Sequence, residues 1–147
     1  MSAERTPART EHASAEFRWP VRVYYEDTDA AGVVYYANYL RFLERARTEW
    51  LSALGIEVDA LAREHGVAFV VHRLDVEYRR PARLGERLAV GVHLVGRGRS
   101  RLELTQDVRR DDVVLVHAAV SLACVEPARW RPARIPAFLL DRLPPTA

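Results

Sequence analysis

Two aspartates lie in a short polar segment directly before a predicted helix, and together with the helix they could support chemistry at a carbonyl group. Asp27 and Asp29 belong to the segment Asp27–Gly32, and the helix is expected to begin near Asn38. A carboxylate can act as a general base toward water or as a nucleophile. The N-terminus of a helix carries unpaired N–H groups and a partial positive charge, which can stabilise an oxyanion. This pairing is the main candidate for a catalytic centre.

The same residues also have an ordinary structural interpretation. Aspartate favours turns and helix caps, so Asp27 and Asp29 could serve the loop alone. We interpret Asp27 as loop-structuring and Asp29 as the catalytic candidate. Tyr36 could line the site or bond a carbonyl, or it could be a core aromatic beside the helix start. Asn38 is interpreted as the helix N-cap, because its side-chain oxygen can accept from first-turn N–H groups.

The helix itself is predicted from apolar residues that recur at spacings of three and four. These residues share one face: Tyr39, Phe42, Leu43, Ala46, Trp50 and Leu54. Gly55 is expected to end the helix, since glycine is favoured just past a helix C-terminus. Before the helix, alternation predicts a strand over Phe17–Glu26, in which Pro20 suggests an edge or a bulge. After it, a short helix is predicted over Val58–Gly66.

Four strands are predicted next, because apolar and polar residues alternate along the chain. They cover Val70–Arg79, Leu88–Leu94, Arg101–Val108 and Val113–Val125. The last of them is apolar on both faces, which indicates a strand covered on both sides. A final short helix is predicted within Pro132–Leu143. One long helix can bury its apolar face against five antiparallel strands only by lying across the sheet, so the fold class is α+β.

Length and composition favour one folded domain. A chain of 147 residues can bury about two thirds of its unfolded surface. Residues 1–15 are predicted to be a disordered tail and residues 16–147 a single domain. All 22 basic residues are arginine, and they are scattered among 20 acids for a net charge of +2. This distribution argues against a nucleic-acid-binding stripe, so no nucleic-acid partner is expected.

The sequence also indicates where the protein works. Cys124 is the single cysteine, so no intrachain disulfide can form and a reducing, cytoplasmic location is expected. No apolar run approaches about 18 residues, so no membrane span is predicted. The N-terminal residues lack the apolar region of a secretory signal.

Other catalytic chemistries lack their usual signatures. Cys124 lies in a buried-strand pattern and is interpreted as a small core residue rather than a nucleophile. His72 lies on an apolar face and is interpreted as a core histidine. His65, His93 and His117 show no metal-ligand spacing, so neither a metal nor another cofactor is predicted. Walker-type, dinucleotide-binding and Gly-x-Ser-x-Gly motifs are absent from the sequence.

Two sequence motifs resemble a known family. The run YEDTDAAGVVYYANY, Tyr25 to Tyr39, resembles the entry loop and helix start of the 4-hydroxybenzoyl-CoA thioesterase family of hotdog proteins. Within that family it is most similar to the acyl-CoA thioesterases associated with the bacterial Tol–Pal system. The run YRRPARLG, Tyr78 to Gly85, resembles the strand end and turn of the same family. The resemblance covers about residues 17–127.

This resemblance implies a fold and an activity. The fold would be the hotdog, a five-stranded antiparallel sheet wrapped around one long helix. The activity would be hydrolysis of an acyl-CoA, or of an acyl carrier protein thioester, with Asp29 as the catalytic carboxylate. The acyl group would be short or aromatic. Many close relatives have histidine where this chain has Tyr36, while tyrosine occurs in the hydroxybenzoyl-CoA branch, so the acyl preference stays open.

The segment Arg97–Arg101 interrupts two predicted strands with three arginines. Arginine offers forked donors that match phosphates, and coenzyme A carries phosphates. In the context of the resemblance, Arg97, Arg99 and Ser100 are therefore expected to contact substrate. The alternative is a solvated turn.

Family members typically assemble as homodimers or homotetramers with sites at subunit interfaces. The sequence supports this, because its apolar surface exceeds what one sheet-and-helix layer can cover; we expect a two-fold interface that extends the sheet. Two other functions stay open. One is a hotdog dehydratase, whose chemistry usually needs a histidine that this loop lacks; the other is a non-catalytic acyl-CoA-binding protein.

Overall fold

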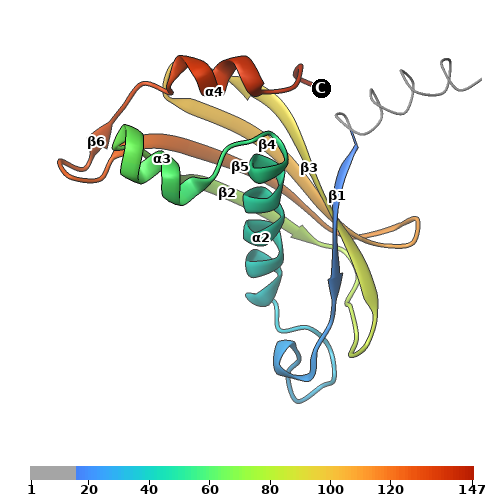
Figure 1. Ribbon diagram of the computed structural model, residues 1–147. Coiled ribbons are helices and arrows are strands. Elements are labelled where there is room, and N and C mark those ends of the chain that lie inside the picture. Colours follow the sequence, from blue (N-terminus) through green and yellow to red (C-terminus); the bar gives the residue numbers. More distant parts are fainter. Residues whose placement is uncertain (1–15) are drawn as a thin grey trace, which may run out of the picture.

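A long helix crosses one face of a curved antiparallel sheet in the computed structural model (Figure 1). The structure describes residues 16–147, so the tail expected over residues 1–15 lies outside the described residues. The strands are β1 (Phe17–Arg22), β2 (Ala68–Tyr78), β3 (Arg87–Arg97), β4 (Arg101–Arg110), β5 (Val113–Glu126) and β6 (Arg131–Pro132). The helices are the 3₁₀ turn η1 (Tyr25–Asp27), α2 (Asn38–Ala53), α3 (Val58–His65) and α4 (Ala137–Arg142).

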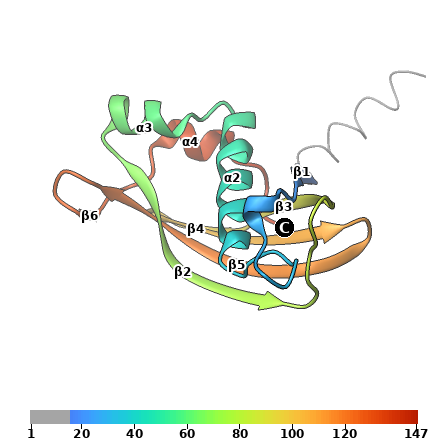
Figure 2. The same ribbon diagram turned by 90° about the horizontal axis from the view of Figure 1, so that it is seen from below.

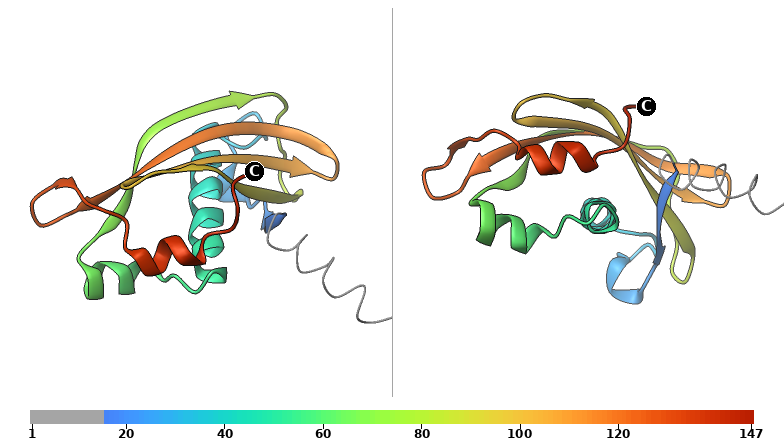
Figure 3. Two further views of the ribbon diagram at one scale, coloured as in Figure 1. Left: turned by 90° about the horizontal axis from the view of Figure 1, so that it is seen from above. Right: turned by 45° about the horizontal axis from the view of Figure 1, so that its top comes forward.

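The strands follow one another in the order β1-β3-β4-β5-β2, and every pairing is antiparallel. The two-residue β6, which the sequence did not predict, pairs with the end of β5. Figure 2 shows the sheet curving around α2. In the right panel of Figure 3, α3 and α4 lie on one side of α2 and the loop with η1 lies on the other. The predicted α+β class is confirmed.

The apolar face of α2 packs on β1, β3 and β4, as its spacing predicted. Five of the six predicted positions are buried, namely Tyr39, Phe42, Leu43, Ala46 and Trp50, and Leu54 is half-buried. Burying a large apolar side chain contributes about 1.5–3 kcal/mol, so this face holds the helix on the sheet. Gly55 follows with a φ of 81°, the left-handed conformation that ends a helix without a Cβ clash.

Strand β1 ends at Arg22, four residues before the predicted end. The Asp27 carboxylate accepts a hydrogen bond from the backbone N–H of Tyr24 at 2.8 Å, and the chain turns into η1 there. This local bond overrides the alternation, so Tyr25 is 82% exposed rather than buried with the apolar face.

Strand β2 forms an open edge of the sheet, and His72 on it is exposed. The prediction of a core histidine was wrong, because the register shifts between Val71 and Arg73 and leaves His72 without a cross-strand partner. The prediction for β5 was correct only in part. Its α2-facing residues are buried, but His117 and Ala119 on the opposite face are exposed.

Cys124 is fully buried, as predicted for a core residue. Burial raises the pKa of its thiol, which disfavours the thiolate that a nucleophile needs.

Within residues 16–147, no helix has both the length and the apolarity needed to cross a membrane.

A buried polar bridge joins α2 to the sheet. Gln106 on β4 is fully buried, and its Nε2 donates to the carbonyl oxygen of Leu43 at 3.1 Å. Its Oε1 accepts from the guanidinium of Arg47 at 2.9 Å. Burial lowers the pKa of Arg47, although a guanidinium remains charged in proteins. Arg47 therefore depends on Gln106 for an acceptor.

We expect Gln106→Leu to lower the free energy of unfolding by about 1–3 kcal/mol, because it leaves Arg47 and the Leu43 carbonyl without their partners. Urea denaturation at a fixed protein concentration measures the change. The double variant Arg47→Leu/Gln106→Leu is the control. The double variant should lose less free energy of unfolding than the two single variants lose together, since no unpaired charge remains buried. Strict additivity would contradict the bridge.

Candidate active site

Asp29 lies in a small hairpin between η1 and α2, here called the Asp29 hairpin (Thr28–Val34). A bridge between Thr28 and Val34 closes it, and the Asp29 N–H donates to the Val33 carbonyl at 2.9 Å. The Asp29 Oδ1 accepts from the N–H of Ala31 at 2.9 Å. Among the described residues, its Oδ2 has no hydrogen-bond partner. The exposed carboxylate is thus held through one oxygen, and its other oxygen is available.

Asp27 lies two residues earlier and has a different environment. Its side chain is 9% exposed, and its Oδ2 accepts from Tyr24. Its carbonyl oxygen accepts from the N–H of Tyr35 at 3.0 Å and from the Asn38 side chain at 2.9 Å. These bonds tie the loop to the start of α2, which fits the loop-structuring interpretation of Asp27.

The start of α2 differs from the prediction. Ala37 occupies the N-cap position and no side chain caps the helix. Asn38 is the first helical residue, and its Nδ2 donates to Asp27 instead of its oxygen accepting from the first turn. No acidic residue lies in the first turn either. The helix terminus therefore keeps its positive end without a side-chain acceptor, as an oxyanion site requires.

Three tyrosines line a cleft of about 250 Å³ beside this helix terminus: Tyr36, Tyr39 and Tyr78. Tyr36 is 61% exposed, so it is not a core aromatic in a single chain. The Tyr78 Oη donates to the Tyr36 carbonyl oxygen at 3.0 Å, and the two rings meet edge-on with centroids 6.2 Å apart. The Tyr39 Oη accepts from the N–H of Ala82 at 3.0 Å. Burial raises the pKa of Tyr39 and of Tyr78, so both phenols stay protonated at neutral pH.

The cleft adjoins the Asp29 hairpin through Val34, which lines it and whose N–H donates to the Ala82 carbonyl at 2.9 Å. Asp29 does not itself line the cleft. Sequence reasoning missed Tyr39 and Tyr78 as lining residues. The available signal was the position of Tyr78 at the start of the second family motif.

The expected coenzyme A contacts lie at the other end of the sheet. Arg97 is the last residue of β3, whose eleven residues span about 35 Å, and Arg99 and Ser100 follow it. The Arg97 Nη1 donates to the carbonyl oxygen of Leu140 at 3.0 Å, while the Arg99 side chain is exposed. Within one chain the structure therefore does not bring these residues together with Asp29.

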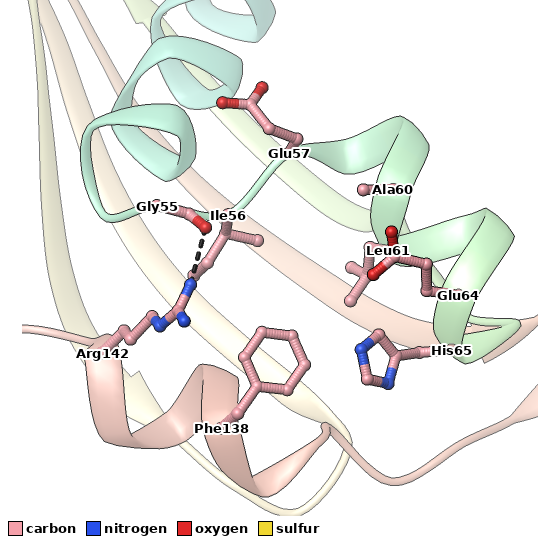
Figure 4. A pocket seen from close by; sticks show the side chains of 9 residues that line it. All are labelled: Gly55, Ile56, Glu57, Ala60, Leu61, Glu64, His65, Phe138 and Arg142. Atoms are coloured by element: carbon pink, nitrogen blue, oxygen red, sulfur yellow. Dashed lines mark hydrogen bonds between the residues drawn. The ribbon is translucent and has the colours of Figure 1, made fainter.

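A separate cavity of about 400 Å³ lies between α3 and α4 (Figure 4). The Arg142 Nη1 donates to the Gly55 carbonyl at 2.7 Å, and its guanidinium lies 5.2 Å from the Phe138 ring centroid. His65 stacks on the same ring at 4.7 Å. These contacts pack α4 onto the C-terminal end of α2, away from the Asp29 hairpin. Within residues 16–147, no group of three His, Cys, Asp or Glu side chains could hold a metal ion.

Comparison with known families identifies the group to which this fold and loop belong. The sequence profile of the Thioesterase-like superfamily matches residues 23–143, which include the Asp29 hairpin, α2 and the long strands from β2 to β5. The chain belongs to the Thioesterase-like superfamily. The predicted family resemblance is confirmed.

The relatives of this thioesterase-like chain are bacterial proteins of similar length. The acyl-CoA thioester hydrolase YbgC of Escherichia coli is 46% identical over 121 residues, which cover 82% of this chain and 90% of that protein. The acyl-CoA thioesterase YbgC of Haemophilus influenzae is 42% identical over 120 residues, covering 82% and 88%. The crystal structure of a probable thioesterase from Bartonella henselae superposes with a TM-score of 0.78 at 32% identity, covering 83% of this chain and all (100%) of that one. The hotdog fold is confirmed.

Proposed function

We propose that this thioesterase-like chain hydrolyses acyl-CoA thioesters to a free acid and coenzyme A. The observation that carries the proposal is the exposed Asp29 carboxylate, with one oxygen available, in the hairpin that leads to the uncapped start of α2. The names of the E. coli and H. influenzae relatives support the same reaction.

The chemistry follows from these groups. Asp29 removes a proton from water, the resulting hydroxide attacks the thioester carbonyl carbon, and the carbonyl oxygen becomes negative. Backbone N–H groups at the start of α2 stabilise that charge, and one such donor contributes about 3 kcal/mol. The C–S bond then breaks, and the coenzyme A thiolate leaves and takes up a proton. In the alternative course, Asp29 attacks the carbonyl directly and water hydrolyses the resulting anhydride.

Tyr36 is proposed as the second catalytic residue. Its phenol is exposed beside the helix start and can donate a hydrogen bond to the thioester carbonyl. The cleft that it shares with Tyr39 and Tyr78 is small and has three aromatic side chains beside Arg79 and Arg80, and its size and aromatic lining support a short or aromatic acyl group. An acyl carrier protein thioester is the alternative substrate.

A second copy of the chain is proposed to complete the site. Strand β2 is an open edge, and the large apolar side chains on its α2-facing side are 38–46% exposed, namely Val71, Leu74 and Tyr78. Antiparallel pairing of two β2 strands would cover them and extend the sheet across a two-fold axis, giving a homodimer or a homotetramer. Such pairing places the end of one β2, next to the Asp29 hairpin, beside the beginning of the other. Arg97, Arg99 and Ser100 of one chain would then approach the Asp29 hairpin of the other.

The lone cysteine indicates the compartment in which the protein works. We infer that the reaction takes place in the cytoplasm, where a lone thiol such as Cys124 stays reduced.

Incubation with acyl-CoA followed by chromatography tests the function. Free acid and coenzyme A in equal amounts are expected. Release of an enoyl thioester would instead indicate a dehydratase, and recovery of intact acyl-CoA a binding protein.

We expect Arg99→Ala to raise KM for acyl-CoA several-fold with a smaller change in kcat, because a contact remote from the thioester binds ground and transition states alike. Steady-state kinetics with a short pantetheine thioester, which lacks the nucleotide, provide the control and should show no change. An equal rise in KM for both substrates would show that Arg99 has a structural role instead.

A further inference from the structure

Two arginines line the cleft of about 250 Å³ beside the start of α2, together with its three tyrosines. We call it the tyrosine cleft and define it by five of its lining residues: Tyr36, Tyr39, Tyr78, Arg79 and Arg80. Arg79 and Arg80 directly follow β2, and their N–H groups both donate to the Leu115 carbonyl, at 2.8 and 3.1 Å. The backbone of this arginine pair is therefore fixed to the sheet at the wall of the cleft. The catalytic proposal gives neither arginine a role.

One of the two arginines has no acid to balance its charge. Arg79 donates to the Glu77 carboxylate, so its charge is largely compensated. The other acid of this region, Glu86, accepts from the Arg110 guanidinium at 2.9 Å. Among the described residues, the exposed Arg80 side chain has neither a carboxylate partner nor a hydrogen bond. The tyrosine cleft therefore has one uncompensated positive charge at its wall.

The other groups of the cleft suit the body of an acyl chain. The Tyr39 hydroxyl already bonds the Ala82 N–H. The Tyr78 hydroxyl bonds the Tyr36 carbonyl oxygen, so neither of these hydroxyls needs a ligand. The tyrosine rings and the Val34 side chain offer apolar surface. A guanidinium pairs with a carboxylate through two parallel hydrogen bonds. The cleft is thus complementary to a ligand with an apolar body and an anionic end.

We propose that the tyrosine cleft holds an acyl group that ends in a free carboxylate, which pairs with the Arg80 guanidinium. The inference rests on the proposed function and names its substrate class, the coenzyme A monothioesters of short or aromatic dicarboxylic acids. The thioester lies toward the Asp29 hairpin, which adjoins the cleft through Val34. The free carboxylate lies at the arginine wall. Asp29 does not line the cleft, so the two carboxylates are kept apart.

The size of the expected preference follows from the exposure of Arg80. An exposed ion pair contributes less than a buried one, and salt screens it. At low salt we expect kcat/KM for a dicarboxylic acyl group to exceed that for its neutral amide about five- to tenfold. The preference should decline at a salt concentration of about 1 M, where the screening length falls to about 3 Å. A contact remote from the thioester should act on KM rather than on kcat, because it binds ground and transition states alike.

Thiol release from matched pairs of substrates tests the assignment. Adipoyl-, pimeloyl- and terephthaloyl-CoA are each compared with the thioester in which a neutral carboxamide replaces the free carboxylate. None of these acids can close a small-ring anhydride onto its own thioester, so spontaneous hydrolysis stays slow. We expect the wild type to prefer the acid in at least one of the three pairs. Equal kcat/KM, or a preference for the amide, in all three pairs would overturn the proposal.

Variants of the cleft assign the preference to one side chain. Arg80→Gln removes the charge and keeps a polar side chain, so KM for the preferred acid should rise about five- to tenfold while KM for its amide stays the same. Arg80→Glu should reverse the preference. Arg83→Gln is the matched control, because it removes the same charge from an exposed residue of the same segment that does not line the cleft. A loss shared equally by acid and amide in Arg80→Gln would contradict the pairing.

The two proposals fail in different ways. If the wild type hydrolyses acids and amides equally well, the substrate class is wrong and the thioesterase proposal stands. If no thiol is released from any acyl-CoA, the catalytic proposal is wrong, and calorimetry with the same intact pairs decides the role of the cleft. Tighter binding of the acid that is lost in Arg80→Gln would support the cleft assignment, and equal binding of acid and amide would overturn it.

Discussion

Asp29→Asn is expected to lower kcat for acyl-CoA hydrolysis by about 10²–10⁴, the range typical of lost general-base catalysis. The change keeps the size of the side chain and its preference for turns but removes its charge and basicity. Asparagine can still accept the hydrogen bond from the Ala31 N–H, so the Asp29 hairpin should keep its shape. KM should change little, because the carboxylate acts chiefly in the transition state. Steady-state kinetics and a thermal unfolding curve of the variant measure both effects.

The matched control is Asp27→Asn in the same loop. The buried Asp27 side chain accepts from Tyr24, a bond that an asparagine oxygen can also make. We therefore expect most of the activity to remain. A folded Asp29→Asn protein that hydrolyses acyl-CoA within a few-fold of the wild type would show that Asp29 is not the base or the nucleophile.

Leu74→Arg is expected to break the proposed oligomer and to remove activity with it. Leu74 is 38% exposed on the α2-facing side of β2, where a second β2 would cover it. An unpaired charge buried in an interface costs about 3–5 kcal/mol, which weakens association at least about a hundredfold. Activity should fall in parallel, because each site is proposed to use two chains. Analytical ultracentrifugation across protein concentrations, combined with thiol release, measures both.

Val113→Arg is the control for this prediction. Val113 is 40% exposed, much like Leu74, but it is the first residue of β5 and lies beyond the stretch of β5 that pairs with β2, which begins at Val116. This variant should assemble and react like the wild type. A wild-type protein that is a stable and active monomer at nanomolar concentration would contradict the assembly itself.

The regular elements could be predicted because local patterns determine them. The apolar residues of α2 recur with the helical period, and the glycines after α2 and α3 take left-handed conformations with φ of 81° and 66°. The predictions were wrong where one side-chain hydrogen bond or one extra residue interrupts the alternation of apolar and polar residues along a strand. The Asp27 carboxylate accepts a hydrogen bond from the Tyr24 N–H, and β1 ends earlier than predicted. The bulge at His72 places this predicted core residue at the surface.

The candidate site was predictable only in its local part. Asp29 could be singled out from Asp27 by the family motif, and the structure adds that Asp27 is buried and bonded to the loop. The contact between Tyr36 and Tyr78 joins residues 42 positions apart, so no local pattern could reveal it.

Release of free thiol by the wild-type protein tests the central claim most directly. Acyl-CoA substrates with short aliphatic, long aliphatic and aromatic acyl groups are compared at several protein concentrations. The account predicts saturable release that is proportional to protein concentration and highest for a short or an aromatic acyl group. Thiol release no faster than the uncatalysed rate for every one of these substrates would contradict it.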